Sequence, residues 1–273
     1  MYVKTNLTKA AGMTPGSAAP KNTNVLVDAE DILSFPESDA NGVKLTGVPT
    51  LKSGGKFITL YSTKSKTEAG METDGDEDMM NFASKFVAQH PGNGLPLKEF
   101  VQNWTGKDVI IFHKACGDDF WEVMGTPCAP LQLKSTKQDN NDGRFYTLSF
   151  EPFAKSGFVP KHYEGDIPFD EPFVVASVGD VDVTPANGIQ YKLPSLAVTA
   201  AVAFGDVTVD HGTMVSLIGS GGVAPATLED GVAGSATVLL KTGVTWTALN
   251  NAVIHLQVFK TDTVTYLIEM SRG

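Results

Sequence analysis

The chain has 273 residues, a length that suits one large domain or two ordinary ones. Its formal net charge of −10 disfavours binding to nucleic acid, because such binding depends on Lys and Arg neutralising phosphates. Solubility alone also accounts for moderate acidity. The sequence has no apolar run long enough to span a membrane, and residues 1–24 lack the apolar stretch of a signal peptide. We therefore expect neither a membrane protein nor a protein exported through a leader.

The N-terminal part of the chain combines an extended arm with short strands. Residues 1–24 are rich in Thr, Ala, Gly, Pro and Lys and show little periodicity, which is typical of an arm that orders against a neighbour. Residues 24–36 predict a strand or a pair of strands, and residues 56–65 alternate in a β pattern. The polar residues 62–78 predict a long exposed loop or hairpin tip.

The next segment shows the periodicity of an amphipathic helix. Met79, Phe82, Phe86 and Val87 recur at helical spacing after an acidic run that would suit the positive end of a helix dipole. The sequence His90-Pro91-Gly92 would end this helix, because the residue before proline is pushed out of the α region. Residues 95–104 predict a second short helix or a turn.

Four β segments follow in quick succession, over residues 108–115, 119–125, 129–136 and 143–151. Turn sequences at 117–119 and 140–143 separate the first pair and the last pair. Closely spaced hairpins of this kind predict an antiparallel meander. Cys116 and Cys128 lie in this region without a Cys-X-X-Cys motif, so we expect two free thiols, with pairing across a hairpin as the alternative.

Four prolines between residues 151 and 172 mark a domain boundary, with residues 166–172 as the linker. Beyond it, short segments rich in Val, Thr and Ala alternate with Gly and Asp turns and show no helical pattern. The predicted fold class is therefore mainly β. A β-sandwich or barrel domain with one flanking α-helix occupies residues 25–165, and a small all-β sandwich occupies residues 173–273.

The sequence offers no pattern that specifies catalysis, a cofactor or a metal. The acidic run at 74–78 lacks the order of an EF-hand and is interpreted as a helix cap in a solvated loop. The glycines at 219–222 lack the Lys-Ser/Thr of a phosphate loop. No two histidines have metal-binding spacing, and His113 and Cys116, three apart in a strand, would face opposite ways. We therefore expect no enzyme activity, no cofactor and no metal site.

The order of elements in residues 25–152 carries a resemblance. A strand, a long polar loop, an amphipathic helix and a β meander follow one another, with the segments 120–126 (FWEVMGT) and 144–150 (RFYTLSF) in the meander. This order resembles the major tail-tube proteins of long-tailed bacteriophages and, more loosely, the inner tubes of contractile injection systems. The resemblance covers about half of the chain.

The resemblance implies a virion structural protein that self-assembles into stacked hexameric rings, forming a tail tube in the host bacterial cytoplasm. DNA would pass through the lumen without specific binding, and the tape measure and tail terminator proteins would be partners. Residues 173–273 would be an immunoglobulin-like domain that decorates the tube and is dispensable for assembly. The N-terminal arm and the loop would bridge successive rings, and the helix would pack on the sheet through Met79, Phe82, Phe86 and Val87. The candidate contact residues of the loop are Lys64, Lys66, Glu68, Met71, Glu72, Asp74 and Asp76.

Three other functions stay open from the sequence. A capsid decoration protein or a neck connector would keep the virion but change the position in it. A carbohydrate-binding β module could use Trp104, Trp121 and Trp246 as a sugar platform. An enzyme of unrecognised type is the third alternative.

Overall fold

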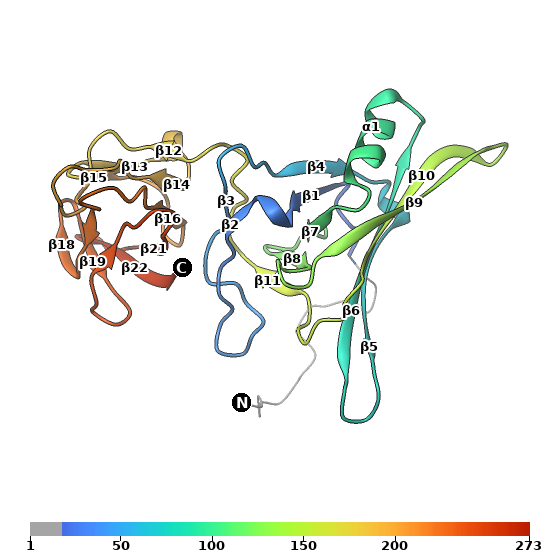
Figure 1. The fold of residues 1–273 in the computed structure, drawn as a ribbon, viewed down its shortest axis with the longest axis horizontal. Helices are drawn as coiled ribbons and strands as arrows, with labels where there is room; N and C mark the ends of the chain where they lie inside the picture. Colours follow the sequence, from blue (N-terminus) through green and yellow to red (C-terminus); the bar gives the residue numbers. More distant parts are fainter. Residues whose placement is uncertain (1–17) are drawn as a thin grey trace. The chain divides into compact units, whose positions relative to one another are not determined.

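The computed structural model describes residues 18–273, and the first seventeen residues of the predicted arm lie outside the described residues. Strands dominate the described chain, as the sequence predicts, and it contains one α-helix (Figure 1). The chain forms two compact units. Of the described residues, the first unit comprises 18–30, 38–44 and 58–164, and the second comprises 31–37, 45–57 and 165–273.

The last and longest segment of the second unit begins at residue 165, and this unit also includes two earlier segments of the chain. The sequence analysis placed residues 31–37 and 45–57 in the first domain, because a boundary drawn along the chain assigns everything before it to one side. The contacts of these residues instead assign them to the second unit. β2 (Ile32–Ser34) pairs with β3 (Thr50–Leu51), and Gln190 donates a hydrogen bond of 3.0 Å to the Pro49 carbonyl oxygen.

The first unit is built on a nine-stranded sheet. The main path runs β11-β8-β7-β9-β10-β6-β5, and β1 pairs with both β4 and β7. Its strands are β1 (Thr23–Asp28), β4 (Ile58–Tyr61), β5 (Thr67–Asp74), β6 (Asn81–Pro91), β7 (Asp108–His113), β8 (Trp121–Met124), β9 (Leu131–Asn140), β10 (Gly143–Pro152) and β11 (Lys161–Tyr163).

The pairing of these strands differs from a simple meander. β7 and β8 form the predicted hairpin, and β9 and β10 form another through the turn at 140–143. However, β8 and β9 do not pair with each other in the sheet. Both run antiparallel to β7, where Ile111 faces Met124 and Val109 faces Leu131. β8 and β9 therefore lie one after the other along the same edge of β7. The loop that connects them leaves the sheet and is closed by a bridge between Thr126 and Ala129.

The predicted helix at residues 79–87 is wrong, because β6 occupies most of this segment. Phe86 is fully buried and Phe82 is half-buried on this strand, whereas Met79 precedes it with 65% of its surface exposed. Val87, also expected on the helix face, pairs with Glu68 of β5 and Ser149 of β10. Phe82, Phe86 and Ala88 fit a period of two, whereas Met79, Phe82, Phe86 and Val87 fit a helical period. Pairing with strands on both sides then decides in favour of the strand.

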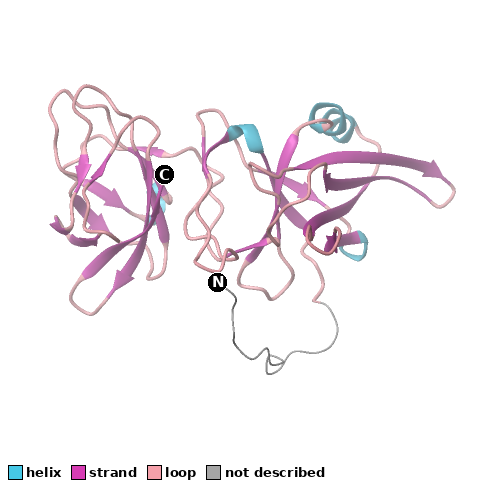
Figure 2. Ribbon diagram, turned by 60° about the horizontal axis from the view of Figure 1, so that its bottom comes forward, coloured by secondary structure: helices cyan, strands magenta, loops and turns pink. Residues whose placement is uncertain are grey.

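The described chain's one α-helix, α1 (Leu95–Trp104), coincides with the second short helix or turn expected from the sequence. Gly94 precedes it and Pro96 lies in its first turn, a position where proline costs no helical hydrogen bond. Figure 2 shows the helix in cyan beside the strands of this unit. Leu97 is buried, and Phe100, Val101 and Trp104 pack against the core of the first unit. This core also contains Phe86, Phe150 and Ile111, among others.

The second unit contains a seven-stranded mixed sheet in the order β12-β14-β16-β21-β22-β19-β18. The pairs β12–β14, β14–β16 and β19–β22 are parallel, which the sequence analysis did not anticipate. The strands are β12 (Phe173–Val174), β13 (Val181–Val183), β14 (Gln190–Lys192), β15 (Phe204–Val207), β16 (Met214–Ile218), β17 (Thr227–Leu228), β18 (Gly231–Ala233), β19 (Ala236–Leu239), β20 (Trp246–Thr247), β21 (Val253–Lys260) and β22 (Thr265–Arg272). Short pairs β13–β15 and β17–β20 complete the unit, and its core includes Tyr191, Phe204 and Trp246.

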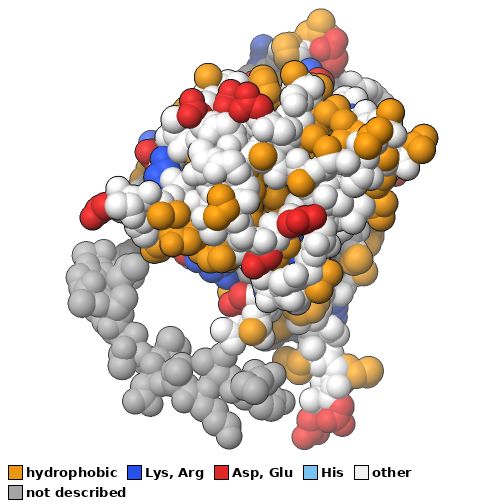
Figure 3. Space-filling view, turned by 90° about the vertical axis from the view of Figure 1, so that its left-hand side faces the viewer, with side chains coloured by type: hydrophobic (Ala, Val, Ile, Leu, Met, Phe, Trp, Pro, Cys, Tyr) orange, Lys and Arg blue, Asp and Glu red, His pale blue; other side chains and the backbone are white. Residues whose placement is uncertain are grey.

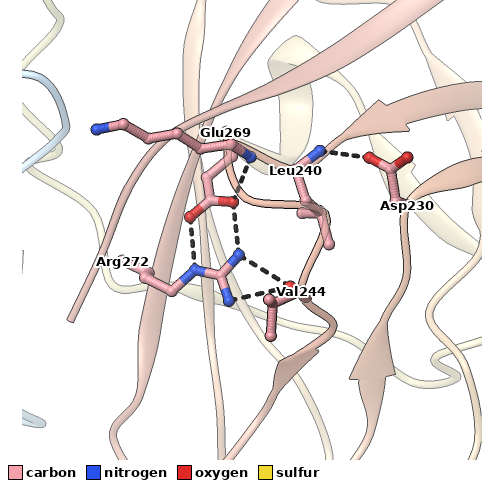
Figure 4. Close-up of polar contacts among 6 residues, drawn as sticks. Asp230, Leu240, Val244, Glu269 and Arg272 are labelled. Atoms are coloured by element: carbon pink, nitrogen blue, oxygen red, sulfur yellow. Dashed lines mark hydrogen bonds and ion pairs between the residues drawn. The ribbon is translucent and has the colours of Figure 1, made fainter.

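A cluster of hydrogen bonds and an ion pair connects the turn after β19 to the last strand, β22 (Figure 4). Arg272 donates to both carboxylate oxygens of Glu269 at 2.5 Å and also to the Val244 carbonyl oxygen, while the Lys241 amide donates to Glu269 at 2.9 Å. A β-bulge in the β21–β22 pair lets these two side chains, three residues apart, share one face. Burial raises the pKa of Glu269, but the Arg272 and Lys241 hydrogen bonds outweigh it and hold that pKa below its ordinary value.

Candidate assembly surface

The longest exposed feature of the first unit is the hairpin formed by β5 and β6. Eight cross-strand pairs join it, from Thr67 opposite Ala88 to Asp74 opposite Asn81. The segment expected to be a loop is therefore largely a strand. Glu68, Met71, Glu72 and Asp74 lie on β5, Asp76 lies in the turn, and Lys64 and Lys66 form the 3-10 turn η2 (Lys64–Lys66) before β5. The sequence analysis located an exposed segment correctly but missed its regular structure, because its polar residues hide the period of two.

The outer half of this hairpin reaches beyond the rest of its sheet (Figure 1). β10 pairs with β6 only over residues 86–91, so residues 81–85 have no strand partner on that side. The segment after β10, which contains Lys155 and Ser156, contacts them instead. Phe82 and Ser156 exchange backbone hydrogen bonds of 2.8 and 3.0 Å, and Lys155 forms an ion pair with Asp74 at 2.5 Å. These contacts reach Phe82 and Asp74, which lie in the last two cross-strand pairs before the turn, so the hairpin is supported close to its tip. Residues 75–80 of the turn pair with no described strand.

The tip combines apolar and acidic side chains. Met79 and Met80 are 65% and 55% exposed, which is unusual for methionine away from an interface. Asp76, Glu77 and Asp78 precede them and are exposed as well. Figure 3 shows acidic side chains gathered at this protruding end, with hydrophobic side chains beside them. A tip of this composition would lose water-exposed apolar surface if it docked on another surface.

A hollow beside the hairpin continues the apolar surface. Met71 from β5 and Phe153, which follows β10, line it together with Lys85, Glu151 and Lys155. Phe153 has 76% of its surface exposed and is approached by the Lys134 ammonium at 5.7 Å from the ring centroid. A large aromatic side chain that remains this exposed is a typical anchor for a partner surface.

An ion network lies at the base of this hollow. Glu151 accepts from Lys134 at 2.8 Å and Lys85 at 2.7 Å, and Ser149 donates to it at 3.0 Å. These donors, Lys134 first, lower the pKa of Glu151 to about 2. The carboxylate therefore stays charged at any physiological pH, and three strands of the sheet remain tied at this point.

β5 also leaves a free strand edge. It ends the path of the nine-stranded sheet and pairs only with β6 among the described strands. Every residue from Glu68 to Asp74 is exposed. A free edge can accept a further strand from another chain, and charged residues on it limit indiscriminate pairing. Glu68, Glu72 and Asp74 provide such charges on this edge.

A second hairpin, β9–β10, presents a different chemistry. Its end is exposed and polar, and Arg144 donates to Asp139 at 2.9 Å while Lys137 lies 3.5 Å from the same carboxylate. It carries no large exposed apolar side chain between residues 135 and 144. Its ion pairs are solvent-exposed and contribute little to stability.

One hollow of the first unit gathers several titratable groups. His113, Glu122, Asp118 and His162 line it. His113 is buried and its Nδ1 donates to the Asn24 side-chain oxygen at 2.8 Å; burial lowers the pKa of this imidazole. Burial, followed by the charge of Asp118, raises the pKa of Glu122. His162 stacks on Phe120 at 4.1 Å between ring centroids.

The described residues that line this hollow include no cysteine and no serine. Cys116, considered with His113 in the sequence analysis, is exposed, and its thiol is 3.9 Å from the Pro20 carbonyl oxygen. Both cysteines are free thiols. Trp246, one member of the suggested sugar platform, is buried in the core of the second unit, and Trp104 stacks on Phe100 of α1.

Among residues 18–273 no group of three or more His, Cys, Asp or Glu side chains is arranged to hold a metal ion. In the same residues no helix is long and apolar enough to cross a membrane. Comparisons with protein-family models, with curated proteins and with solved structures found no match. A function is therefore inferred from the surfaces of the chain itself.

Proposed function

We propose that this protein is a self-assembling structural protein of a virion, and that the β5–β6 hairpin is its principal contact with neighbouring copies. The observation that carries this proposal is the hairpin itself. It projects beyond its sheet, exposes Met79 and Met80 at its tip, and leaves the edge of β5 without a partner among the described strands. Such a surface favours a protein–protein contact over the binding of a small molecule.

The specific role that we propose is the subunit of a bacteriophage tail tube, with hexameric rings stacked through the hairpin. The mainly β architecture, the acidic net charge and the projecting hairpin support this role. A surface with net charge −10 would repel passing DNA and keep it from adhering to the tube. The helix that carried the resemblance is absent from residues 79–87, where β6 lies instead, but α1 follows the hairpin and precedes β7.

Negative-stain electron microscopy of the purified protein tests the proposal. We expect rings or tubes for the native chain. The double variant Met79→Asp/Met80→Asp should remain folded, because both side chains are exposed, but should no longer form tubes. Leu95→Asp is a matched control: Leu95 is 67% exposed at the start of α1 and lies outside the hairpin, so this variant should assemble normally.

Two outcomes would contradict the proposal. A native chain that stays monomeric at high concentration would exclude self-assembly by this protein alone. Tubes of normal length from the methionine double variant would exclude the hairpin tip as the contact. Particles that bind only to capsids would instead support a decoration or connector role.

The structure changes one expectation about truncation. Removing the C-terminal domain was expected to leave assembly intact, as for a peripheral decoration. However, Leu45, Val48 and Phe57 are buried and belong to the second unit. Without residues 165–273 they would lose their packing partners, so we expect that truncation to aggregate rather than to give bare tubes.

A further inference from the structure

Residues 45–51, here called the strap, lie on one face of the seven-stranded sheet of the second unit. Leu45, Gly47, Val48, Pro49 and Thr50 are all buried. The Pro49 carbonyl oxygen accepts the hydrogen bond from Gln190, and β3 at the end of the strap pairs with β2. The strap is therefore an integral part of this unit, although more than a hundred residues separate it from the unit's main segment, 165–273.

The face under the strap carries a row of polar side chains. The row comprises Gln190, Ser216, His255 and Ser271, which are cross-strand neighbours on four adjacent strands and are all buried. The apolar core lies on the opposite side of the sheet, where Ile254 and Leu256 point. A buried polar row of this kind is stable only while its groups are satisfied or neutral.

His255 is the one titratable member of the row. Its exposed fraction is 1%, and its Nδ1 is 2.8 Å from the Ser216 hydroxyl oxygen. Its Nε2 is buried and has no hydrogen-bond partner among the described residues. The strap covers the ring closely: a Cβ on Gly47 would lie 2.5 Å from His255 Cγ, so only glycine allows this approach.

We propose that the strap is an acid-released latch, held on the sheet while His255 is neutral and displaced when the imidazole gains a second proton. A protonated imidazole donates from both nitrogens. Whichever nitrogen carries the hydrogen of the neutral ring, the cation has an N–H at Nε2 that is buried without a hydrogen-bond partner among the described residues, together with a buried charge. Lifting the strap lets water reach this nitrogen.

The neighbouring elements provide no charge that would compensate for the proton. Ser216 on β16, Ser271 on β22 and Thr50 on the strap are neutral. The charged side chains closest in sequence on β22, Glu269 and Arg272, pair with each other on the other face of the sheet. Lys52 follows the strap and is itself cationic. Burial is accordingly the cause that lowers the pKa of His255 to about 4.

The direction of the effect follows from this depressed pKa. The latch has its full stability above the ordinary histidine pKa of 6.5 and loses it as the pH falls toward about 4. If the open form has the ordinary pKa, linkage predicts that the equilibrium for opening increases about 80-fold between pH 6.5 and pH 4.

Hydrogen exchange of the full chain, followed by mass spectrometry, measures this opening. Labelling times at pH 6.5 and pH 4 are scaled for the intrinsic exchange rate. We expect amides of residues 45–51 to lose protection by roughly 80-fold at pH 4, as the linkage predicts. His255→Gln removes the titration and should keep the strap protected at pH 4. His162→Gln, at a half-exposed histidine of the first unit, is the control and should behave like the native chain.

The native comparison decides the question even if His255→Gln fails to fold. Equal strap protection at both pH values would refute the latch. An equal loss of protection in a folded His255→Gln variant would also refute it, because another group would then be responsible. Neither measurement depends on tube formation, so the latch and the proposed assembly role can fail independently.

Discussion

Substituting Gly47 by alanine tests the close packing of the strap at neutral pH. The added Cβ would lie 2.5 Å from Cγ, 2.6 Å from Cδ2 and 3.0 Å from Cβ of His255. Carbon atoms in contact normally keep about 3.5–4.0 Å apart, so the strap or the ring must move by about 1 Å. His255 is held in the middle of a sheet and bonded to Ser216, so we expect the strap to move.

Two opposing effects determine how much Gly47→Ala changes the stability of the closed strap. Overpacking of a tight core costs about 1–3 kcal/mol. Alanine also restricts the unfolded chain, which returns about 0.4–1 kcal/mol. Gly47 does not have a positive φ, so no backbone strain is added. The net loss of about 1–2 kcal/mol corresponds to a roughly 5- to 30-fold increase in opening of the strap.

Hydrogen exchange at pH 7 measures this opening directly, with amides of 45–51 as the readout. Gly179→Ala is the matched control in the same unit, because a Cβ there would meet only the Ser177 hydroxyl oxygen at 3.8 Å. The reasoning fails if Gly47→Ala is as well protected as the native chain. Adding His255→Ala to Gly47→Ala should recover much of the loss specific to Gly47, since the clash requires the ring. If the double variant loses as much strap protection as Gly47→Ala alone, the added Cβ does not clash with the His255 ring.

Three further predictions concern stability. Glu269→Gln should lower the free energy of unfolding of the second unit by about 2 kcal/mol, measured by urea unfolding, because it breaks a largely buried ion pair with Arg272. In the native chain the ionised Glu269 stabilises the fold above the ordinary glutamate pKa, and this stabilisation is lost as the pH falls below that value. The stability of the variant should therefore change less when the pH is lowered. Phe86→Ala should cost about 3–5 kcal/mol in the first unit, since Phe86 is fully buried, and an unchanged thermal midpoint would contradict the assigned core. Arg144→Ala should cost less than about 1 kcal/mol, because its ion pair with Asp139 is exposed, and a larger loss by the same measurement would point to an unseen role for the β9–β10 hairpin.

Two errors of the sequence analysis have one physical origin. Residues 79–87 have the spacing of a helix, yet β6 pairs there with β5 and, further along, with β10. β8 and β9 have the spacing of a hairpin, yet both pair with the same edge of β7. In each case the local pattern allowed two structures, and hydrogen bonds to strands elsewhere in the chain selected one of them.

The candidate surface was predicted in part. The polarity of residues 62–78 was enough to indicate exposure, and the structure places the suggested contact residues from Glu68 to Asp76 on one projecting hairpin with its turn. The exposed Phe153 was missed. An aromatic residue next to a proline gives no sign in the sequence of whether it faces the core or solvent.

Local patterns in the sequence were sufficient to predict the mainly β class, the turns at 117–119 and 140–143 and a short helix or turn at 95–104. These features depend on residues close together in the chain: glycine and asparagine in turns, a proline in the first turn of a helix, and alternation along a strand. Tertiary structure alone decided the partners of β6 and β7 and the place of the strap. Those outcomes depend on which buried surface each segment fits, and the surface that accepts residues 45–51 is built from strands more than a hundred residues further on.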